Sequence, residues 1–438
     1  MHDRALERFL DYARFDSVIL KSLIACVGLL ISTLLRAMRR EPRALELETS
    51  LHRNAFFPPV DRIVESRASE SIAARSGKLA GYLDNLRPQP ATEAFFRDPA
   101  RLVGHRILAV KSPDSGEKGV LIVDYSFVFS LLARFFDVEQ IASRYHIVLE
   151  PSWSGLCDRD VLVFAGYDFP VFVQSHEPRD IEFLRRFRSN LIPVPIAANW
   201  WVDHRVFRPL PSASRDADVL INSAWARFKR HEAVFSAVAG LRRKGHRLAL
   251  ILVGYAMDMT RDDVFDLAKR HGIANQIEMF ERLQPEQVNE QLNRVRVNLV
   301  WSRREGSNRA IIEGFAAGVP GILRAGFNYG HEYPFMNPAT GSYATDRNLA
   351  STLTKLISNY DEYDPRAWVV QNMSPQVATR MLDEAIARYA VAAGEKWTMK
   401  QMAVKVTSLD SMAYWDETAR ERFDPDHRFV LSTLRQPV

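Results

Sequence analysis

The hydrophobic pattern of the chain changes most clearly around residue 300. Residues 297–301 form an apolar run that is long enough for a buried strand and too short for a helix. Residues 302–307 are polar and charged, and from Asn308 onward apolar residues recur at helical spacing. Gly318, followed two residues later by a proline, ends this helix, and residues 321–323 begin a second strand. The pattern predicts a strand, a polar loop, a helix and another strand in succession.

Short apolar runs and helical patterns alternate in the same way from residue 105 to about residue 375. This alternation predicts an α/β fold with two Rossmann-like, doubly wound parallel-sheet domains. Strands are expected at residues 107–110, 119–123, 147–149, 161–164, 171–174, 218–222, 248–254, 276–282, 297–301, 321–323 and 342–345. Helices are expected at residues 127–136, 181–187, 262–271, 285–293 and 348–360. A further helix follows residues 225–231 and ends at about residue 243, and the tail is expected to be helical, including residues 412–422.

Four segments follow from this pattern. A helical N-terminal extension covers residues 1–104, and the first α/β domain covers residues 105–211. A proline- and serine-containing linker at residues 211–214 leads into the second α/β domain, residues 212–375. Residues 376–438 form a C-terminal helical tail.

The most apolar part of the N-terminal extension is residues 18–35. Its uncharged part, residues 22–35, is shorter than the roughly 20 residues that span a bilayer. Four arginines follow at once, as is typical of a segment that enters the cytoplasmic leaflet of a membrane: Arg36, Arg39, Arg40 and Arg43. Two interpretations stay open, namely membrane contact through residues 18–43 and a helix buried against protein.

Composition narrows the class of protein. With 438 residues, 47% hydrophobic and 25% charged, the chain is an ordinary globular protein of two or three domains. A formal charge of +5 is small for this length and gives no reason to expect a nucleic-acid partner. Cys26 and Cys157 are the only cysteines, which suits a reducing compartment and therefore a cytoplasmic protein. No Asp-x-Asp motif and no His/Cys cluster at ligand spacing occurs, so neither a metal site nor a bound cofactor is predicted.

The loop before residue 309 is the strongest candidate for a binding site. Unpaired backbone amides and the positive end of a helix dipole make such a loop a natural seat for a phosphate. Glu305 and Glu313 bracket it, and carboxylates are good acceptors for sugar hydroxyl groups. This arrangement suggests a ligand with hydroxylated rings on both sides of a phosphate, such as a nucleotide sugar.

These residues resemble a known signature. Glu305-Gly306, Glu313 and Ala317-Gly318-Val319-Pro320 look like the donor site of the family 4 retaining glycosyltransferases, which have the B-type fold of two Rossmann-like domains facing a cleft. In that family, the first domain holds the acceptor, the second holds the nucleotide-sugar donor, and the last helix crosses back to the first domain. The resemblance covers roughly residues 105–375.

The resemblance implies roles for individual residues. Glu313 would hold the ribose, Glu305 would contact the donor sugar, and the diphosphate would lie on the amides of the loop, at Gly306, Ser307, Asn308 and Arg309. The family often has a second glycine where this chain has Asn308 and a proline where it has Ala310. Asparagine is, after glycine, among the residues that best tolerate a left-handed backbone, so the first of these changes is mild.

Further site residues follow from the same resemblance. Lys229 occupies the position of the lysine that grips the diphosphate, and Arg227 is a shifted substitute for the arginine beside it; the alternative for both is a solvated helix start. The loop at Arg282 and Leu283 would hold the base, and Gly254 at the end of its strand would also contact the donor. In the first domain, His176 follows a predicted strand, where it would lie near the donor sugar or only cap the next helix.

The function expected from sequence is transfer of a sugar from a nucleoside diphosphate sugar to an acceptor, with retention and without a metal. The acceptor would be a cell-envelope glycan or lipid-linked glycan of a bacterium, reached from the cytoplasmic face of the inner membrane. Two alternatives remain: a nucleotide-sugar epimerase or sugar phosphorylase of the same fold, and a membrane-tethered binding partner whose donor pocket has decayed.

Overall fold

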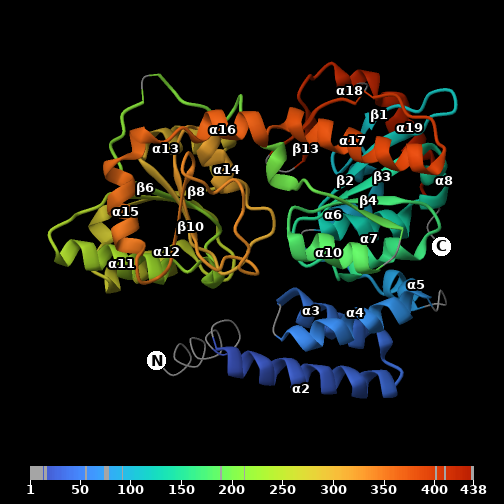
Figure 1. Ribbon diagram of the computed structural model, residues 1–438, viewed down its shortest axis with the longest axis horizontal. Helices are drawn as coiled ribbons and strands as arrows, with labels where there is room; N and C mark the ends of the chain where they lie inside the picture. Colours follow the sequence, from blue (N-terminus) through green and yellow to red (C-terminus); the bar gives the residue numbers. More distant parts are fainter. Residues whose placement is uncertain are drawn as a thin grey trace. The chain divides into compact units, whose positions relative to one another are not determined.

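The chain contains two separate main sheets, each flanked by helices (Figure 1). The computed structural model describes residues 13, 17–54, 57–73, 78–90, 92–187, 190–211, 213–399, 402–408 and 411–435, so Ser212 of the predicted linker lies outside the described residues. Its residues divide into two compact units. The first unit comprises residues 1–197, 381–404 and 416–438, and the second comprises residues 198–380 and 405–415.

The sheet of the first unit has five strands in the order β1-β2-β3-β4-β5. Strand β1 runs antiparallel to β2, and the other neighbours are parallel. Strands β1 to β4 are buried along their whole length, as expected for a sheet that is covered on both faces. The strands are β1 (Ile107–Lys111), β2 (Gly119–Asp124), β3 (Tyr145–Glu150), β4 (Val171–Gln174) and β5 (Leu191–Val194).

Helices connect the parallel strands of this sheet: α7 (Ser126–Phe135), α8 (Val138–Arg144), α9 (Arg159–Leu162), the 3-10 turn η3 (Val163–Gly166) and α10 (Pro178–Phe187). The strand expected at residues 161–164 is therefore wrong, because these residues are helical. A short apolar run has no period that distinguishes a buried strand from a buried helical turn.

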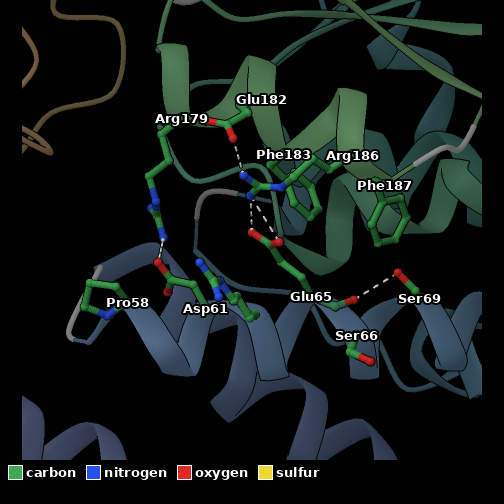
Figure 2. A pocket seen from close by; sticks show the side chains of 11 residues that line it. Pro58, Asp61, Glu65, Ser66, Ser69, Arg179, Glu182, Phe183, Arg186 and Phe187 are labelled. Carbon is green, nitrogen blue, oxygen red and sulfur yellow. Dashed lines mark hydrogen bonds and ion pairs between the residues drawn. The ribbon is translucent and has the colours of Figure 1, made fainter.

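The N-terminal extension consists of helices α2 (Val18–Ala37), α3 (Glu41–Asn54), α4 (Pro58–Ala73), α5 (Lys78–Asp84) and α6 (Glu93–Arg97), followed by the turn η2 (Pro99–Leu102). Helix α4 lies against α10 of the first unit around a cavity of about 670 Å³ (Figure 2). Arg179 and Arg186 of α10 reach across to Asp61 and Glu65 of α4, at 2.9 Å each. These ion pairs join the extension to the helices that cover the sheet within the first unit.

The tail contains helices α17 (Pro375–Ala393), α18 (Ala419–Arg422) and α19 (Asp424–Ser432). Tyr389 of α17 packs edge-on against Phe172 of β4 and His146 of β3, so the tail contributes to the core of the first unit. Residues 412–414, expected to be helical, instead form strand β13 (Met412–Tyr414), which pairs antiparallel with β12 (Lys405–Thr407) in the second unit.

The second unit is built on six parallel strands in the order β11-β10-β9-β6-β7-β8. The strands are β6 (Val219–Asn222), β7 (Leu250–Gly254), β8 (Ile277–Glu281), β9 (Val297–Val300), β10 (Gly321–Arg324) and β11 (Gly341–Ala344). The helices are α11 (His231–Arg243), α12 (Arg261–Arg270), α13 (Pro285–Arg294), α14 (Arg309–Ala316), α15 (Leu349–Ser358) and α16 (Pro365–Asn372). The chain runs outward in one direction from β6 and in the other from β9, so the sheet is doubly wound with its switch point between these two strands.

The turns η4 (Ala198–Trp201), η5 (Arg227–Lys229), η6 (Ala274–Gln276) and η7 (Tyr360–Glu362) complete the second unit. Helix α14 ends as its sequence predicts. Gly318 has φ of +76°, the amide of Gly318 donates to Phe315 at 3.0 Å, and the amide of Val319 donates to Gly314 at 2.9 Å. This pair of bonds is a Schellman motif, which requires the left-handed backbone that glycine adopts without strain.

Candidate donor site of the second unit

The loops that follow β6 and β9 meet at the carboxyl edge of the second sheet. In an open α/β sheet, ligands bind at this edge where the strand order reverses. The amide of Arg303, in the loop after β9, donates to the carbonyl of Phe228, in the loop after β6, at 2.8 Å. The structure therefore brings together the two segments in which most of the predicted donor residues occur.

Helix α14 begins at this edge with unused hydrogen-bond donors. The side chain of Asn308 caps the helix by accepting from the amide of Ile311 at 3.0 Å. Among the described residues, none accepts a hydrogen bond from the five amides that precede Ile311, those of Gly306, Ser307, Asn308, Arg309 and Ala310. A run of free amides at the positive end of a helix is suited to an anion.

Asn308 does not use a left-handed backbone. Its φ is −60° and its ψ is 112°, the extended conformation of an N-cap residue. The tolerance of asparagine for left-handed backbone is therefore not what makes this residue fit. Asn308 fits because its side-chain oxygen accepts the capping bond, which a glycine could not do. Asn199 also donates to the backbone carbonyl of Asn308 at 3.3 Å.

Helix α14 lies very close to strand β9. Asn298 of β9 is fully buried and donates to the carbonyl of Ala310 at 2.7 Å. A methyl group at Gly314 would stand 2.2 Å from the side-chain nitrogen Nδ2 of Asn298 and 2.8 Å from its Cγ. Only glycine allows this approach, which sets the position of the neighbouring Glu313.

Glu305 and Lys229 form an ion pair in the site. The Lys229 ammonium and the Ser302 hydroxyl both donate to Oε1 of Glu305, and both members of the pair have side chains only 10% exposed. The amide of Glu305 donates to Oδ1 of Asn328 at 2.7 Å. Because an ammonium group has three donors, Lys229 can hold Glu305 and still donate to a bound anion.

Several residues that brace this loop were not identified from sequence. Nε and Nη2 of Arg324 donate to the carbonyls of Ser302 and Arg303 at 3.0 and 3.1 Å. Asn328 has φ of +52° and binds the amide of Glu305. Arg324 is the last residue of β10 and Asn328 lies in the loop that follows it, and nothing in their local pattern distinguishes them from residues without a role in a site.

Asp346, in the loop after β11, binds side chains from two other loops, those of Arg230 and Trp301. Arg230 donates to its two oxygens at 2.8 and 2.6 Å, and the indole of Trp301 donates at 3.1 Å. Arg230 itself has φ of +58° at the start of α11. The pair with Asp346 offsets the positive charge of Arg230 at a helix N-terminus, where it is otherwise unfavourable.

Glu313 lies on the first turns of α14 and faces strand β6. Asn222, the last residue of β6, donates to Oε2 of Glu313 at 3.1 Å. Burial raises the pKa of Glu313 above its usual value, and the charge of Arg309 and the bond from Asn222 only partly oppose this shift. Asn222 was not predicted as a site residue, although a polar residue at the end of a buried strand is a usable signal.

The predicted base-binding segment follows β8. Arg282 is exposed with φ of +52°, and its amide donates to the carbonyl of Gly254 at 2.9 Å, while Leu283 packs against the core of the unit. A methyl group at Gly254 would stand 2.3 Å from the carbonyl oxygen of Ser223 and 2.7 Å from the indole nitrogen of Trp225. Gly254 therefore has a packing role that its sequence position did not reveal.

The remaining predicted residues are placed differently. Arg227 is exposed, and its amide donates to Asp258 at 3.1 Å. His176 is half-buried just after β4 and belongs to the first unit, whereas the other predicted residues belong to the second. Within the ranges that the structure describes, no group of three or more His, Cys, Asp or Glu side chains is placed to hold a metal ion.

Two units, each with a parallel or mostly parallel sheet flanked by helices, and a row of amides without an acceptor in the described residues at the switch point of the second, define a two-domain α/β protein. Residues 205–364 match the model of the family described as glycosyl transferases group 1. The resemblance to B-type glycosyltransferases that the sequence indicated is confirmed.

Solved structures with a similar fold include three from named organisms. Sucrose-phosphate synthase from Thermosynechococcus elongatus is 15% identical with a TM-score of 0.48, over 63% of this chain and 74% of that one. HepE from Anabaena, in complex with UDP, is 13% identical with a TM-score of 0.47, over 61% and 79%. A glycosyltransferase from Rickettsia africae is 14% identical with a TM-score of 0.43, over 76% and 96%. A search of curated protein sequences found no match.

Proposed function

We propose that this glycosyltransferase takes a nucleoside diphosphate sugar as its donor and transfers the sugar with retention and without a metal ion. The observation that carries the proposal is the row of five free amides at the start of α14, with Lys229 held beside it by Glu305. Backbone amides and an ammonium group supply the positive electrostatic environment that a diphosphate requires.

Carboxylates lie on both sides of the free amides. Glu313 would accept hydrogen bonds from the ribose hydroxyls, with Asn222 holding one of its oxygens in place. Glu305 would accept from a hydroxyl of the donor sugar through Oε2, because Oε1 is occupied by Lys229 and Ser302. The base would lie at Arg282 and Leu283.

The proposed reaction needs no protein nucleophile. The bond between the anomeric carbon and the diphosphate oxygen breaks, and the acceptor oxygen forms a new bond on the same face of the sugar. The proton of the acceptor hydroxyl passes to the departing diphosphate. Negative charge grows on that oxygen in the transition state, and Lys229 and the amides of α14 would stabilise it.

The proposed acceptor is a cell-envelope or lipid-linked glycan of a bacterium. Support for a position at the cytoplasmic face of a membrane comes from α2, a 20-residue helix that contains an 18-residue stretch with mean hydropathy of 2.4 and has many exposed apolar side chains. A glycan acceptor carried by a lipid is presented at such a surface.

The donor proposal predicts that one nucleoside diphosphate stabilises the protein. UDP, GDP and ADP are added separately, and the midpoint of thermal unfolding is measured; the diphosphate that raises it identifies the base. Affinity for that diphosphate is expected to fall about 10- to 100-fold in Glu313→Ala, because hydrogen bonds to a charged acceptor are lost.

Glu290→Ala, which removes an exposed carboxylate from α13, serves as the matched control and should bind normally. If none of the three diphosphates raises the unfolding midpoint, the proposed donor site is wrong.

Nucleotide binding should also depend on pH through Glu313. The ionised carboxylate accepts two ribose hydroxyl bonds, whereas the protonated form has less acceptor capacity. Because burial raises the pKa of Glu313, affinity should be highest at neutral pH and should fall as the pH drops through that raised pKa, before it reaches the ordinary value of about 4.3. Titration calorimetry of wild type and Glu313→Gln measures this. A pH dependence that persists in Glu313→Gln would assign the effect to another group.

A further inference from the structure

Helix α2 presents its apolar side outward. In a water-soluble unit, the apolar side of a surface helix faces the core. On α2 the buried positions are the small or polar residues Ala25, Gly28 and Ser32. The outward side has seven large apolar residues that are between 37% and 74% exposed: Ile19, Leu23, Ile24, Val27, Leu30, Ile31 and Leu34; Met38, which caps the helix, is 60% exposed. The outward side is therefore suited to an apolar medium.

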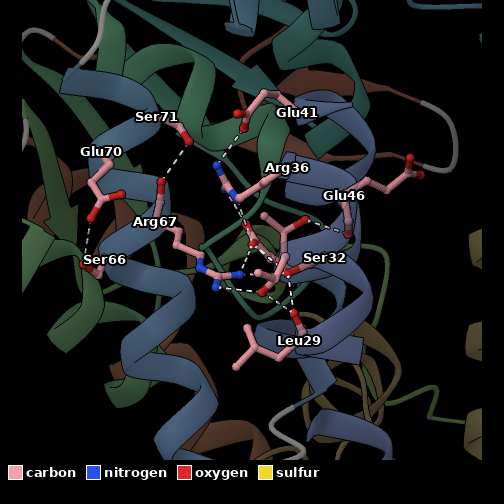
Figure 3. A network of polar contacts seen from close by, with 12 residues as sticks. Leu29, Ser32, Arg36, Glu41, Glu46, Ser66, Arg67, Glu70 and Ser71 are labelled. Atoms are coloured by element: carbon pink, nitrogen blue, oxygen red, sulfur yellow. Dashed lines mark hydrogen bonds and ion pairs between the residues drawn. The ribbon is translucent and has the colours of Figure 1, made fainter. Parts of the chain in front are cut away.

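The inward side of α2 is joined to α3 and α4 by a polar cluster, defined here as Ser32, Arg36, Glu48 and Arg67 (Figure 3). Glu48 of α3 is fully buried and accepts from Ser32 at 2.9 Å, from Arg36 at 2.6 Å and from Arg67 of α4 at 2.8 Å. Burial opposes ionisation of Glu48, but the bonds from Arg36 and Arg67 prevail and lower its pKa. The carboxylate is therefore ionised at neutral pH.

This cluster excludes a membrane-spanning position for α2 in the folded unit. Helices α3 and α4 pack along α2. Leu51 of α3 lies so close to Gly28 that a methyl group added to Gly28 would stand 3.0 Å from its side chain. If α2 crossed a bilayer, the charged side chains of α3 would enter the hydrocarbon with it: Glu41, Arg43, Glu46, Glu48 and Arg53. Charged groups at that depth are costly, so a packed α2 can contact lipid only with its outward side.

Basic residues follow the apolar face. Arg39, Arg40 and Arg43 are exposed at and just beyond the C-terminal end of α2, and within the described part of the chain their side chains form no ion pair. Apolar residues on one side of a helix and arginines at its end are the features of a helix that lies in the headgroup region of an anionic membrane.

We propose that α2 docks the first unit on the surface of an anionic lipid bilayer, with the helix axis in the plane of the membrane. The outward apolar side enters the boundary between headgroups and acyl chains, and the three arginines contact the headgroups. The ion pairs of Arg179 and Arg186 with α4 join this anchor to α10 and thus to the sheet of the first unit. The docking does not depend on the donor site, since it needs no nucleotide.

The first test is co-sedimentation of the full chain with vesicles of phosphatidylcholine, with or without phosphatidylglycerol, in the absence of nucleotide. Binding is expected to be stronger on the anionic vesicles and to weaken as the salt concentration rises. Each replacement of one of the three arginines with glutamine should weaken binding by roughly fivefold. Val27→Glu and Leu30→Glu should each lower the partition coefficient by at least about 10-fold, since each replaces an exposed apolar side chain that would enter the bilayer with a charged one.

Val391→Glu is the matched control. Val391 lies on helix α17 of the first unit and is 79% exposed, so it should tolerate the same change with no effect on vesicle binding. Circular dichroism confirms that each variant is folded. Equal binding of wild type and Leu30→Glu, or no binding of wild type to either vesicle, would overturn the proposal. A dimer in the absence of vesicles that Leu30→Glu dissociates would assign the face to a second copy of the chain.

The second test determines the orientation of α2. Single cysteines are placed at its two ends, as Val18→Cys and Arg39→Cys, in a Cys26→Ser background; the remaining Cys157 is buried. The protein is bound to preformed sealed vesicles and treated from outside with a membrane-impermeant maleimide. Reaction at both ends is expected for an in-plane helix, whereas protection of one end until detergent is added would show a spanning helix and overturn the proposal.

Discussion

Lys229→Met should lower the turnover number for sugar transfer by about 10²- to 10³-fold, the range seen when one donor to a developing oxyanion is removed. Lys229 is held beside the free amides of α14 by Glu305, where its remaining N–H groups would face the departing diphosphate. Methionine keeps most of the volume of the side chain and removes only the charge. The expected effect falls on kcat more than on the donor KM, because the charge on the leaving oxygen is greatest in the transition state.

Steady-state transfer with the sugar donor of the diphosphate that binds is the measurement. Lys269→Met, which removes an exposed lysine from α12 of the same unit, is the matched control. Loss of Lys229 also leaves Glu305 without its cation, which can lower the stability of the fold. The free energy of unfolding is therefore measured for Lys229→Met and for Lys229→Met/Glu305→Gln, in which the unpaired charge is removed as well. A kcat within a few-fold of wild type in a folded Lys229→Met protein would contradict the proposed role.

Gly314→Ala should destabilise the second unit by about 1–3 kcal/mol, as overpacking of a close-fitted core does. Alanine normally favours a helix over glycine by roughly 0.5–1 kcal/mol, so propensity alone predicts the opposite sign. The loss arises because the added methyl would stand 2.2 Å from the side-chain nitrogen Nδ2 of Asn298, which forces α14 away from β9. Glu313 and the free amides move with the helix, so affinity for the nucleoside diphosphate should fall as well.

Gly240→Ala is the matched control, since Gly240 lies inside helix α11 and the nearest atom to a new methyl is the flexible end of Arg243, 3.8 Å away. Chemical denaturation should show Gly240→Ala at least as stable as wild type. In an Asn298→Ala background, the cost of Gly314→Ala should shrink but not vanish, because the contact at 2.9 Å with Cβ of Asn298 remains. Equal costs in both backgrounds would exclude Asn298 as the cause.

The elements that the sequence located best are those with local and complete signals. The strand, loop and helix at residues 297–316 combine an apolar run, a polar loop, an amphipathic face and a glycine stop, and each of these acts within one or two turns of chain. Strand β5 (Leu191–Val194) was not predicted, because Pro193 cannot donate to a neighbouring strand. The sheet accommodates it because β5 is an edge strand, a fact that only the strand order reveals.

The residues of the candidate site also fall into those that the sequence indicated and those that only the structure revealed. Glu305, Gly306 and Glu313 could be identified from one contiguous stretch, because their spacing around a helix start is itself the signal. The partners of these residues come from other loops: Lys229 and Asn222 after or at the end of β6, Asn328 after β10. Their sequence separations exceed 20 residues, and no pattern within a single segment indicates such pairs.

Helix α2 shows the division most directly. Its sequence determined that residues 18–35 are apolar and helical, which left both membrane contact and burial against protein open. The packing of α3 and α4 decided which side of that helix is covered, because Glu48 and Arg67 bind Ser32 and Arg36 from one direction only. Local interactions along the chain determine whether an element forms, whereas the side that it exposes depends on contacts between segments distant in sequence, and only the tertiary structure provides these.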